Sequence, residues 1–236
     1  MKIDDLLNST KPIIYETGQE EWPYLLSGTC YPVKYDGALF ITSAFHCYED
    51  RNIQPDVTLY PRPEDATSFF AFDQISRARA PQAADDKHGD HVLLRVARSH
   101  HCQGEMDKVV ALDLADSGNV RPPIGGDIKD FWIRGYPHDA PKHRIDYDLC
   151  KISQQAYTTN GRIGADIGPF DFCYSIRMMT PIPDGMHPSG MSGTPVYGVT
   201  NDGRPVYCGM ITRYVELTRQ YIAIGPEILV NSLRRA

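Results

Sequence analysis

Short apolar runs broken by turn residues constrain the fold of this chain more than any other feature of its sequence. Glycine, proline, asparagine and aspartate separate the runs, and few stretches show the apolar spacing of a helix. Strand-like runs occupy residues 12–15, 25–33, 38–43, 57–60, 75–80 and 92–97 in the first half and residues 128–135, 148–158, 172–179, 194–199, 205–212 and 221–224 in the second. Many short strands with regular turns predict an all-β protein.

Turn sequences divide these runs into two groups of six. Asp-Gly at residues 36–37 and Asn-Asp-Gly at residues 201–203 favour tight hairpins. The turn-rich residues 116–123 separate the groups, so we expect two six-stranded antiparallel β-barrels, over residues 25–117 and 118–236, after an N-terminal segment over residues 1–24. Residues 228–235, which follow Gly-Pro-Glu and have a basic end, predict a C-terminal helix in the second domain.

The composition excludes several classes of protein. A length of 236 residues with 42% hydrophobic residues suffices for one large buried core or two small ones. A net charge of −6 gives no reason to expect a nucleic-acid partner. The first eight residues are too short and acidic for a signal peptide, and no apolar run approaches a membrane span. We therefore expect a cytoplasmic protein with no membrane partner.

One serine stands between two glycines directly before a predicted strand. Residues 190–195 read Gly-Met-Ser-Gly-Thr-Pro, with Ser192 between the glycines. A serine hydroxyl is a poor nucleophile unless a base takes its proton and nearby donors stabilise the oxyanion that forms. Flanking glycines let the backbone approach a carbonyl closely and direct N–H groups at it. Taken alone, the pattern fits a turn serine equally well.

A candidate base and a candidate acid lie upstream of this serine. His46 follows the predicted strand 38–43, and Asp90 opens the predicted strand 92–97. A histidine held just beyond a buried strand can act as a general base. The chain order His, Asp, Ser belongs to one class of catalytic triad, and the order Ser, acid, His is excluded because no histidine follows Ser192. Asp85 and Asp86, in a polar loop, are weaker candidates for the acid.

Together these motifs resemble the trypsin/chymotrypsin-like superfamily of serine peptidases, in particular its intracellular, bacterial-type members. Residues 43–47 (Ser-Ala-Phe-His-Cys) are similar to the family's Thr-Ala-Ala-His-Cys, and residues 90–94 (Asp-His-Val-Leu-Leu) to its Asp-Ile-Ala-Leu-Leu. Residues 190–195 are similar to its Gly-Asp-Ser-Gly-Gly-Pro. The resemblance covers residues 25–236 and implies the same two barrels and C-terminal helix.

The resemblance implies a serine endopeptidase that needs no metal or cofactor. His46 accepts the proton of Ser192, which attacks a peptide carbonyl to form an acyl-enzyme. Asp90 orients the imidazole, and the backbone N–H groups of Gly190 and Ser192 form the oxyanion hole. The expected partner is a protein or peptide substrate.

The resemblance also indicates which residues bind the substrate: Met186, His187, Thr212, Arg213 and Tyr214. Met186 stands where trypsin-like members carry an acid, so a preference for Lys or Arg is not supported. Tyr214 and Tyr221 fall where open-pocket members carry glycine and favour a small side chain, whereas Arg213 and His187 favour an acidic one, and the sequence leaves both open. Thr212 stands where the family has a serine beside the catalytic acid, and we expect its hydroxyl to make the same bond.

Met191 marks a departure from the secreted digestive members of this family. Those members carry an aspartate before the serine, which pairs with a newly cleaved N-terminus. Without that carboxylate we expect no activation by cleavage. The loop is then ordered by its own contacts, by substrate or by a regulatory protein partner.

Other candidate sites are less specific. Six widely spaced cysteines in a cytoplasmic protein favour reduced thiols, although the resemblance leaves a Cys30–Cys47 disulfide open. His88, His91 and residues 100–102 (His-His-Cys) match no structural zinc spacing, so we expect no metal.

Two other classes of function stay open beside the peptidase. The first is a catalytically silent peptidase-like module that binds peptides. The second is an effector subunit that needs a partner for activation. The complete triad and both glycines argue against the silent module.

Overall fold

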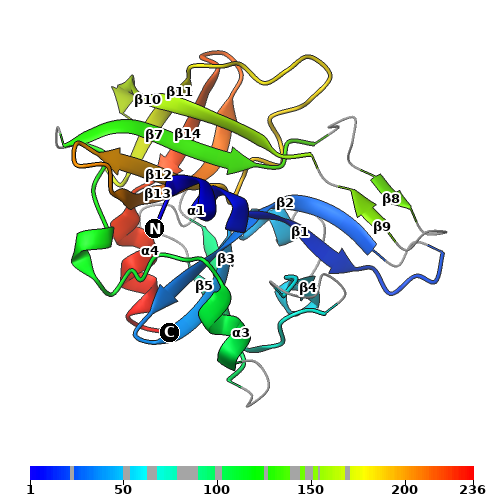
Figure 1. Cartoon of the computed structure of the whole chain (residues 1–236). Helices are drawn as coiled ribbons and strands as arrows, with labels where there is room; N and C mark the ends of the chain where they lie inside the picture. The colour runs from blue at the N-terminus through cyan, green and yellow to red at the C-terminus, as the bar shows by residue number, and fades with distance from the viewer. Residues whose placement is uncertain are drawn as a thin grey trace.

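A computed structural model gives the fold of the chain. It describes residues 1–21, 24–49, 54–62, 68–78, 90–98, 103–124, 127–138, 144–146, 151–153, 155–167 and 171–236. Strands dominate and gather into two sheets that pack against each other, the second above the first in Figure 1. No helix in these ranges is long and apolar enough to cross a membrane.

The first sheet has six antiparallel strands in the order β4-β1-β2-β3-β6-β5 and forms a half-barrel with two open edges. Its strands are β1 (Lys11–Glu16), β2 (Tyr24–Tyr35), β3 (Ala38–Ser43), β4 (Thr58–Leu59), β5 (Phe72–Ala78) and β6 (His91–Val96). β1 lies within the segment 1–24 that precedes the predicted first barrel. The expected hairpin joins β2 to β3, with φ of 49° at Asp36 and 72° at Gly37, as a type I′ turn requires.

The second sheet closes into a barrel in the order β10-β11-β14-β13-β12-β7, since β7 pairs with both β10 and β12. Its strands are β7 (Ile128–Gly135), β10 (Tyr157–Ile167), β11 (Cys173–Met178), β12 (Pro195–Thr200), β13 (Pro205–Val215) and β14 (Gln220–Ile224). A separate hairpin contains β8 (Arg144–Asp146) and β9 (Lys151–Ser153). The expected all-β fold of two six-stranded antiparallel sheets is thus confirmed, with only the second sheet closed.

One predicted strand of the second sheet differs from the structure. The run expected at residues 148–158 lies partly outside the described residues, and the barrel strand there is β10, which continues through the turn-like pair Asn160-Gly161. A Cβ at Gly161 would lie 2.6 Å from Ile176 Cγ2 of the neighbouring strand β11. Glycine therefore permits close strand packing here rather than a turn.

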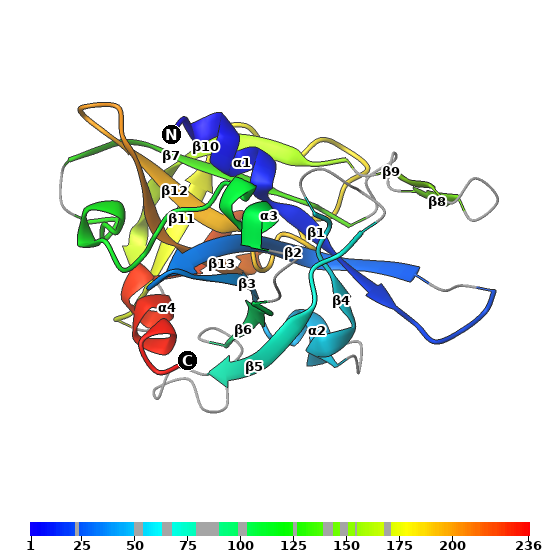
Figure 2. The same ribbon diagram turned by 60° about the horizontal axis from the view of Figure 1, so that its bottom comes forward.

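The helices are short: α1 (Ile3–Ser9), α2 (His46–Glu49), α3 (Gln103–Lys108) and α4 (Pro226–Leu233), with 3₁₀ turns η1 (Pro55–Val57) and η4 (Ser117–Asn119). The expected C-terminal helix is α4, which begins with a proline at its first turn and buries Leu229 and Leu233. Beyond α4 the chain returns to the first sheet, where Gln74 of β5 donates to the Ala236 carbonyl at 2.8 Å (Figure 2).

Buried tyrosines join the two sheets. The hydroxyls of Tyr31 in β2 and Tyr207 in β13 form a 2.7 Å hydrogen bond in the core. The Tyr197 ring meets the Tyr207 ring edge-on at 6.5 Å. Burial holds the pKa of the Tyr31 and Tyr207 phenols well above the usual value, so both stay protonated and keep this bond.

Removal of one hydroxyl from this pair is expected to destabilise the protein. Tyr207→Phe deprives the buried Tyr31 hydroxyl of this partner, which costs about 1–3 kcal/mol of unfolding free energy. The double variant Tyr31→Phe/Tyr207→Phe should lose less unfolding free energy than the sum of the losses in the two single variants, because neither hydroxyl is left in the core without the other. Urea unfolding measures all three, and strictly additive costs would contradict this role.

Candidate active site

The pairing of β3 with β6 brings His46 to Asp90. Ser43 at the end of β3 pairs with Val92 near the start of β6. Because the two strands are antiparallel, the residues just after Ser43 and just before Val92 lie at the same edge of the sheet. The hydroxyl of Thr42 donates to the Val92 carbonyl at 2.9 Å and holds this edge.

The carboxylate of Asp90 is fully buried and uses both oxygens on His46. Oδ1 lies 3.0 Å from Nδ1 of the imidazole, and Oδ2 accepts from the His46 backbone N–H at 2.7 Å. A carboxylate bonded to Nδ1 fixes the tautomer with Nδ1 protonated and leaves Nε2 as the acceptor. His46 stands at the start of α2 and is itself nearly buried.

Thr29 of β2 holds the segment that contains Ser192. Its backbone N–H donates to the Ser192 carbonyl at 2.9 Å, and its hydroxyl donates to the Gly190 carbonyl at 2.8 Å. The same hydroxyl accepts from the Tyr136 N–H at 3.1 Å. A Cβ at Gly193 would lie 2.1 Å from the Thr29 carbonyl oxygen, so only glycine allows this approach. The first sheet therefore shapes a loop of the second.

A tight turn orients the backbone before Ser192. The Met191 N–H donates to the Pro188 carbonyl at 3.1 Å, and Gly190 has a φ of +96°, as the third position of a type II turn requires. The Ser189 carbonyl accepts from the His138 N–H at 2.7 Å. Because the C=O and N–H of a trans peptide point in opposite directions, the Gly190 N–H faces away from His138.

The second N–H group of the predicted oxyanion hole is oriented in the same way. The Met191 carbonyl, in the same peptide as the Ser192 N–H, accepts from the Thr194 N–H at 3.0 Å. Within the described ranges, neither the Gly190 nor the Ser192 N–H donates a hydrogen bond. Two oriented donors two residues apart are what a developing oxyanion needs.

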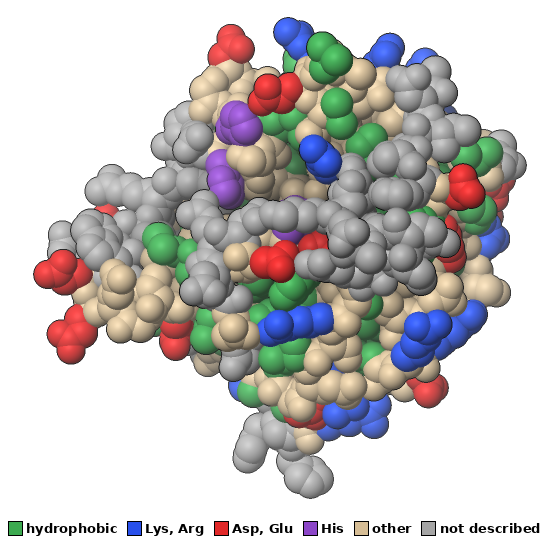
Figure 3. All heavy atoms as spheres, turned by 180° about the vertical axis from the view of Figure 1, so that it is seen from behind, with side chains coloured by type: hydrophobic (Ala, Val, Ile, Leu, Met, Phe, Trp, Pro, Cys, Tyr) green, Lys and Arg blue, Asp and Glu red, His purple; other side chains and the backbone are tan. Residues whose placement is uncertain are grey.

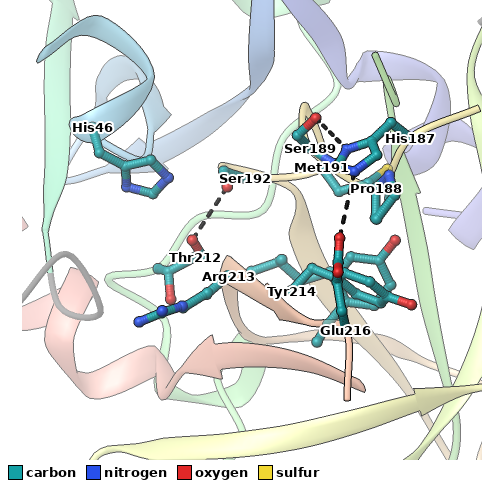
Figure 4. Close-up of a pocket in the computed structure, with 12 residues that line it drawn as sticks. His46, His187, Pro188, Ser189, Met191, Ser192, Thr212, Arg213, Tyr214 and Glu216 are labelled. Carbon is teal, nitrogen blue, oxygen red and sulfur yellow. Dashed lines mark hydrogen bonds and ion pairs between the residues drawn. The ribbon is translucent and has the colours of Figure 1, made fainter. Parts of the chain in front are cut away.

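His46 and Ser192 line one cavity of about 530 Å³ (Figure 4). Figure 3 shows histidine side chains gathered on one face of the molecule, with acidic and basic side chains close by. The Ser192 hydroxyl donates to the Thr212 carbonyl at 3.2 Å, and the described contacts include no bond from it to His46. Such bonds are often loose before substrate binds.

Four of the five predicted substrate-binding residues line this cavity: His187, Thr212, Arg213 and Tyr214. Met186 is half-buried and does not line it, so its role in substrate binding stays a prediction. The bond expected from the Thr212 hydroxyl to the catalytic acid is wrong. A register shift in the β13–β14 pairing at residue 212 turns this hydroxyl toward β14, where it donates to the Ile222 carbonyl at 3.5 Å.

Several residues of this site belong to no motif that the sequence reveals. Thr29 and His138 form hydrogen bonds to loop residues that lie more than 50 positions away in the sequence. No local motif reveals such contacts. Glu216, in the turn after β13, also lines the cavity and belongs to no motif. Tyr221 of β14 lines it as well, as the resemblance implies.

The cysteines beside the site are thiols rather than a disulfide. Cys47 Sγ donates to the Ser192 carbonyl at 3.6 Å, and Cys30 Sγ to the Pro12 carbonyl at 3.7 Å. His88 and residues 100–102 lie outside the described residues. Among the residues that are described, no group of three potential metal ligands occurs.

Met191 anchors the loop in the core of the second barrel. Its side chain is fully buried and packs on the backbone of β7, where a Cβ at Gly135 would lie 2.8 Å from its Sδ. An apolar anchor thus occupies the position where the secreted peptidases that the motif resembles carry an aspartate.

Comparison with known proteins identifies the fold. No protein-family model matches the sequence, and neither does any curated protein. The structure is similar to human heparin binding protein, with a TM-score of 0.59 and 12% identity over 98% of this chain and 92% of that one. It is also similar to the scabies mite inactivated protease paralogue S-I1, with a TM-score of 0.58 and 15% identity over 100% and 96%.

Both neighbours are trypsin/chymotrypsin-fold proteins, and identities of 12% and 15% establish the fold alone. The chain therefore has a chymotrypsin-like fold, and the expected fold class is confirmed.

Thr29→Val is expected to loosen the loop without unfolding the protein. The Gly190 carbonyl and the Tyr136 N–H lose their shared partner, so amide hydrogen exchange across residues 188–193 should speed up about ten-fold. Thr29→Ser keeps the hydroxyl and should restore slow exchange. Unchanged exchange in the valine variant would show that the hydroxyl does not hold this loop.

Substitutions at Met191 should separate packing from charge. Met191→Leu conserves an apolar side chain of similar volume and should cost less than about 1.5 kcal/mol. Met191→Asp buries a carboxylate without a described cationic partner and should cost clearly more. Thermal unfolding of both variants measures this, and an aspartate variant as stable as the leucine variant would refute a purely apolar anchor.

Proposed function

We propose that the chain is a serine endopeptidase that cleaves peptide bonds in protein substrates through His46, Asp90 and Ser192. The observation that carries the proposal is the buried carboxylate of Asp90, whose two oxygens both contact His46. Burial of a charge is costly unless partners compensate it, and among the described residues both groups that bond this carboxylate belong to the candidate base. The imidazole is thereby held with Nε2 ready to accept a proton.

In this mechanism the Ser192 hydroxyl leaves the Thr212 carbonyl, turns to His46 and gives its proton to Nε2. Its oxygen then attacks the substrate carbonyl, and the oxyanion accepts from the N–H groups of Gly190 and Ser192. Collapse expels the amine, which takes the proton from His46, and water releases the acyl group by the same steps. Asp90 stabilises the imidazolium throughout and stays ionised.

The contacts of the loop support activity without proteolytic activation. Met191, Thr29 and His138 hold the segment through an apolar anchor and three hydrogen bonds, none of which needs a new N-terminus. In this proposal the N–H groups of Gly190 and Ser192 are already oriented for an oxyanion before substrate binds.

A second candidate function is peptide binding without cleavage. It is favoured by the bond from the Ser192 hydroxyl to the Thr212 carbonyl, which turns the hydroxyl away from His46 (Figure 4). One structural neighbour is itself named an inactivated protease paralogue. The same cavity would then hold a peptide that is not attacked.

A fluorophosphonate probe separates the two candidates. The wild-type protein should be labelled and Ser192→Ala should not, because the probe reacts with an activated serine. Asp90→Asn should slow labelling by about four orders of magnitude, since an amide reverses the histidine tautomer.

Circular dichroism of each variant shows that it is folded. A folded wild type that stays unlabelled would favour the peptide-binding module. Labelling that requires a lysate would instead favour an effector subunit activated by a partner.

A further inference from the structure

One wall of the cavity beside Ser192 presents a histidine in a fixed tautomer. Nδ1 of His187 accepts from the Ser189 backbone N–H at 3.2 Å and lies 2.6 Å from the Ser189 hydroxyl. A backbone N–H can only donate, so Nδ1 carries no proton and the neutral ring has its proton on Nε2. His187 therefore offers an N–H donor at Nε2.

This donor faces the carboxylate of Glu216 across a narrow gap. Nε2 of His187 lies 3.7 Å from Oε1 of Glu216, which is too far for a hydrogen bond (Figure 4). The oxygen and nitrogen of a primary amide lie roughly 2.3 Å apart, by its bond lengths. An amide that lies alongside this pair can thus accept from Nε2 through its oxygen and donate to the carboxylate through its nitrogen.

Tyr221 also lines the cavity, but its hydroxyl lies beneath the surface. The Tyr221 hydroxyl is buried, and no described residue hydrogen-bonds to it. Burial raises the pKa of this phenol, so the hydroxyl stays protonated and can donate. This hydroxyl lies behind the lining, so recognition of an amide falls to His187 and Glu216.

We propose that this cavity selects glutamine or asparagine as the residue on the acyl side of the cleaved bond, with His187 and Glu216 reading the two ends of the side-chain amide. The inference rests on the proposed function, which places the substrate carbonyl at Ser192. Arg213, one of the two groups expected to attract an acidic side chain, points away from His187 in Figure 4.

Other substrate side chains use this cavity less well. A glutamate would place a second carboxylate beside Glu216, and like charges repel. A lysine would pair with Glu216 but leave the Nε2 donor of His187 facing a cation. An alanine would make neither of the two contacts that His187 and Glu216 offer.

Binding of cleavage-product peptides tests the inference apart from catalysis. Fluorescence anisotropy on the Ser192→Ala variant compares peptides that differ only in their C-terminal residue: glutamine, asparagine, glutamate, lysine or alanine. Of the glutamine and asparagine peptides, the one that binds more tightly should have a dissociation constant at least ten-fold lower than those of the glutamate, lysine and alanine peptides. Glu216→Gln in the same background should reduce the preference for amide over glutamate at least five-fold.

The matched control is Glu20→Gln, an exposed residue outside the cavity lining. It should retain the full amide preference. A glutamate, lysine or alanine peptide that binds as tightly as both amide peptides would overturn the inference, as would an unchanged preference in Glu216→Gln. Fluorophosphonate labelling judges the proposed function separately. A labelled protein without amide preference refutes only this inference, and an unlabelled one with the preference refutes only the peptidase.

Discussion

The carboxylate of Asp90 lies fully buried where β3 and β6 meet, and the geometry of the site depends on how its charge is compensated. Both of its oxygens contact His46, one through the backbone and one through the ring. The backbone contact fixes where α2 begins, and the ring contact fixes the orientation and tautomer of the imidazole. A single buried charge thereby links the pairing of two strands to the protonation state of the candidate base.

The candidate nucleophile depends in turn on the contact between the two sheets. Thr29 of the first sheet bonds the carbonyls of Gly190 and Ser192, and the absence of a side chain at Gly193 lets it come so close. Met191 anchors the same segment in the barrel core. The segment around Ser192 is therefore shaped from both sides, which explains how it is ordered without a charged pair at residue 191.

The sequence predicts the parts of this site whose chemistry is local. Asp36-Gly37 marks its hairpin because both residues need positive φ, and the motifs around His46, Asp90 and Ser192 each combine a reactive side chain with a strand end. Contacts between distant segments escape such reading: Thr29 and Gly190 lie 161 positions apart. Barrel closure likewise overrides the turn preference of Asn160-Gly161, and a register shift at residue 212 redirects the Thr212 hydroxyl.

Pre-steady-state kinetics with a p-nitrophenyl ester test most directly whether Asp90 and His46 make Ser192 a working nucleophile. An acyl-enzyme mechanism predicts a burst of about one equivalent of nitrophenol, together with a mass increase of one acyl group on the peptide that contains Ser192. Linear release without a burst, and an unmodified Ser192 peptide from folded protein, would contradict the account.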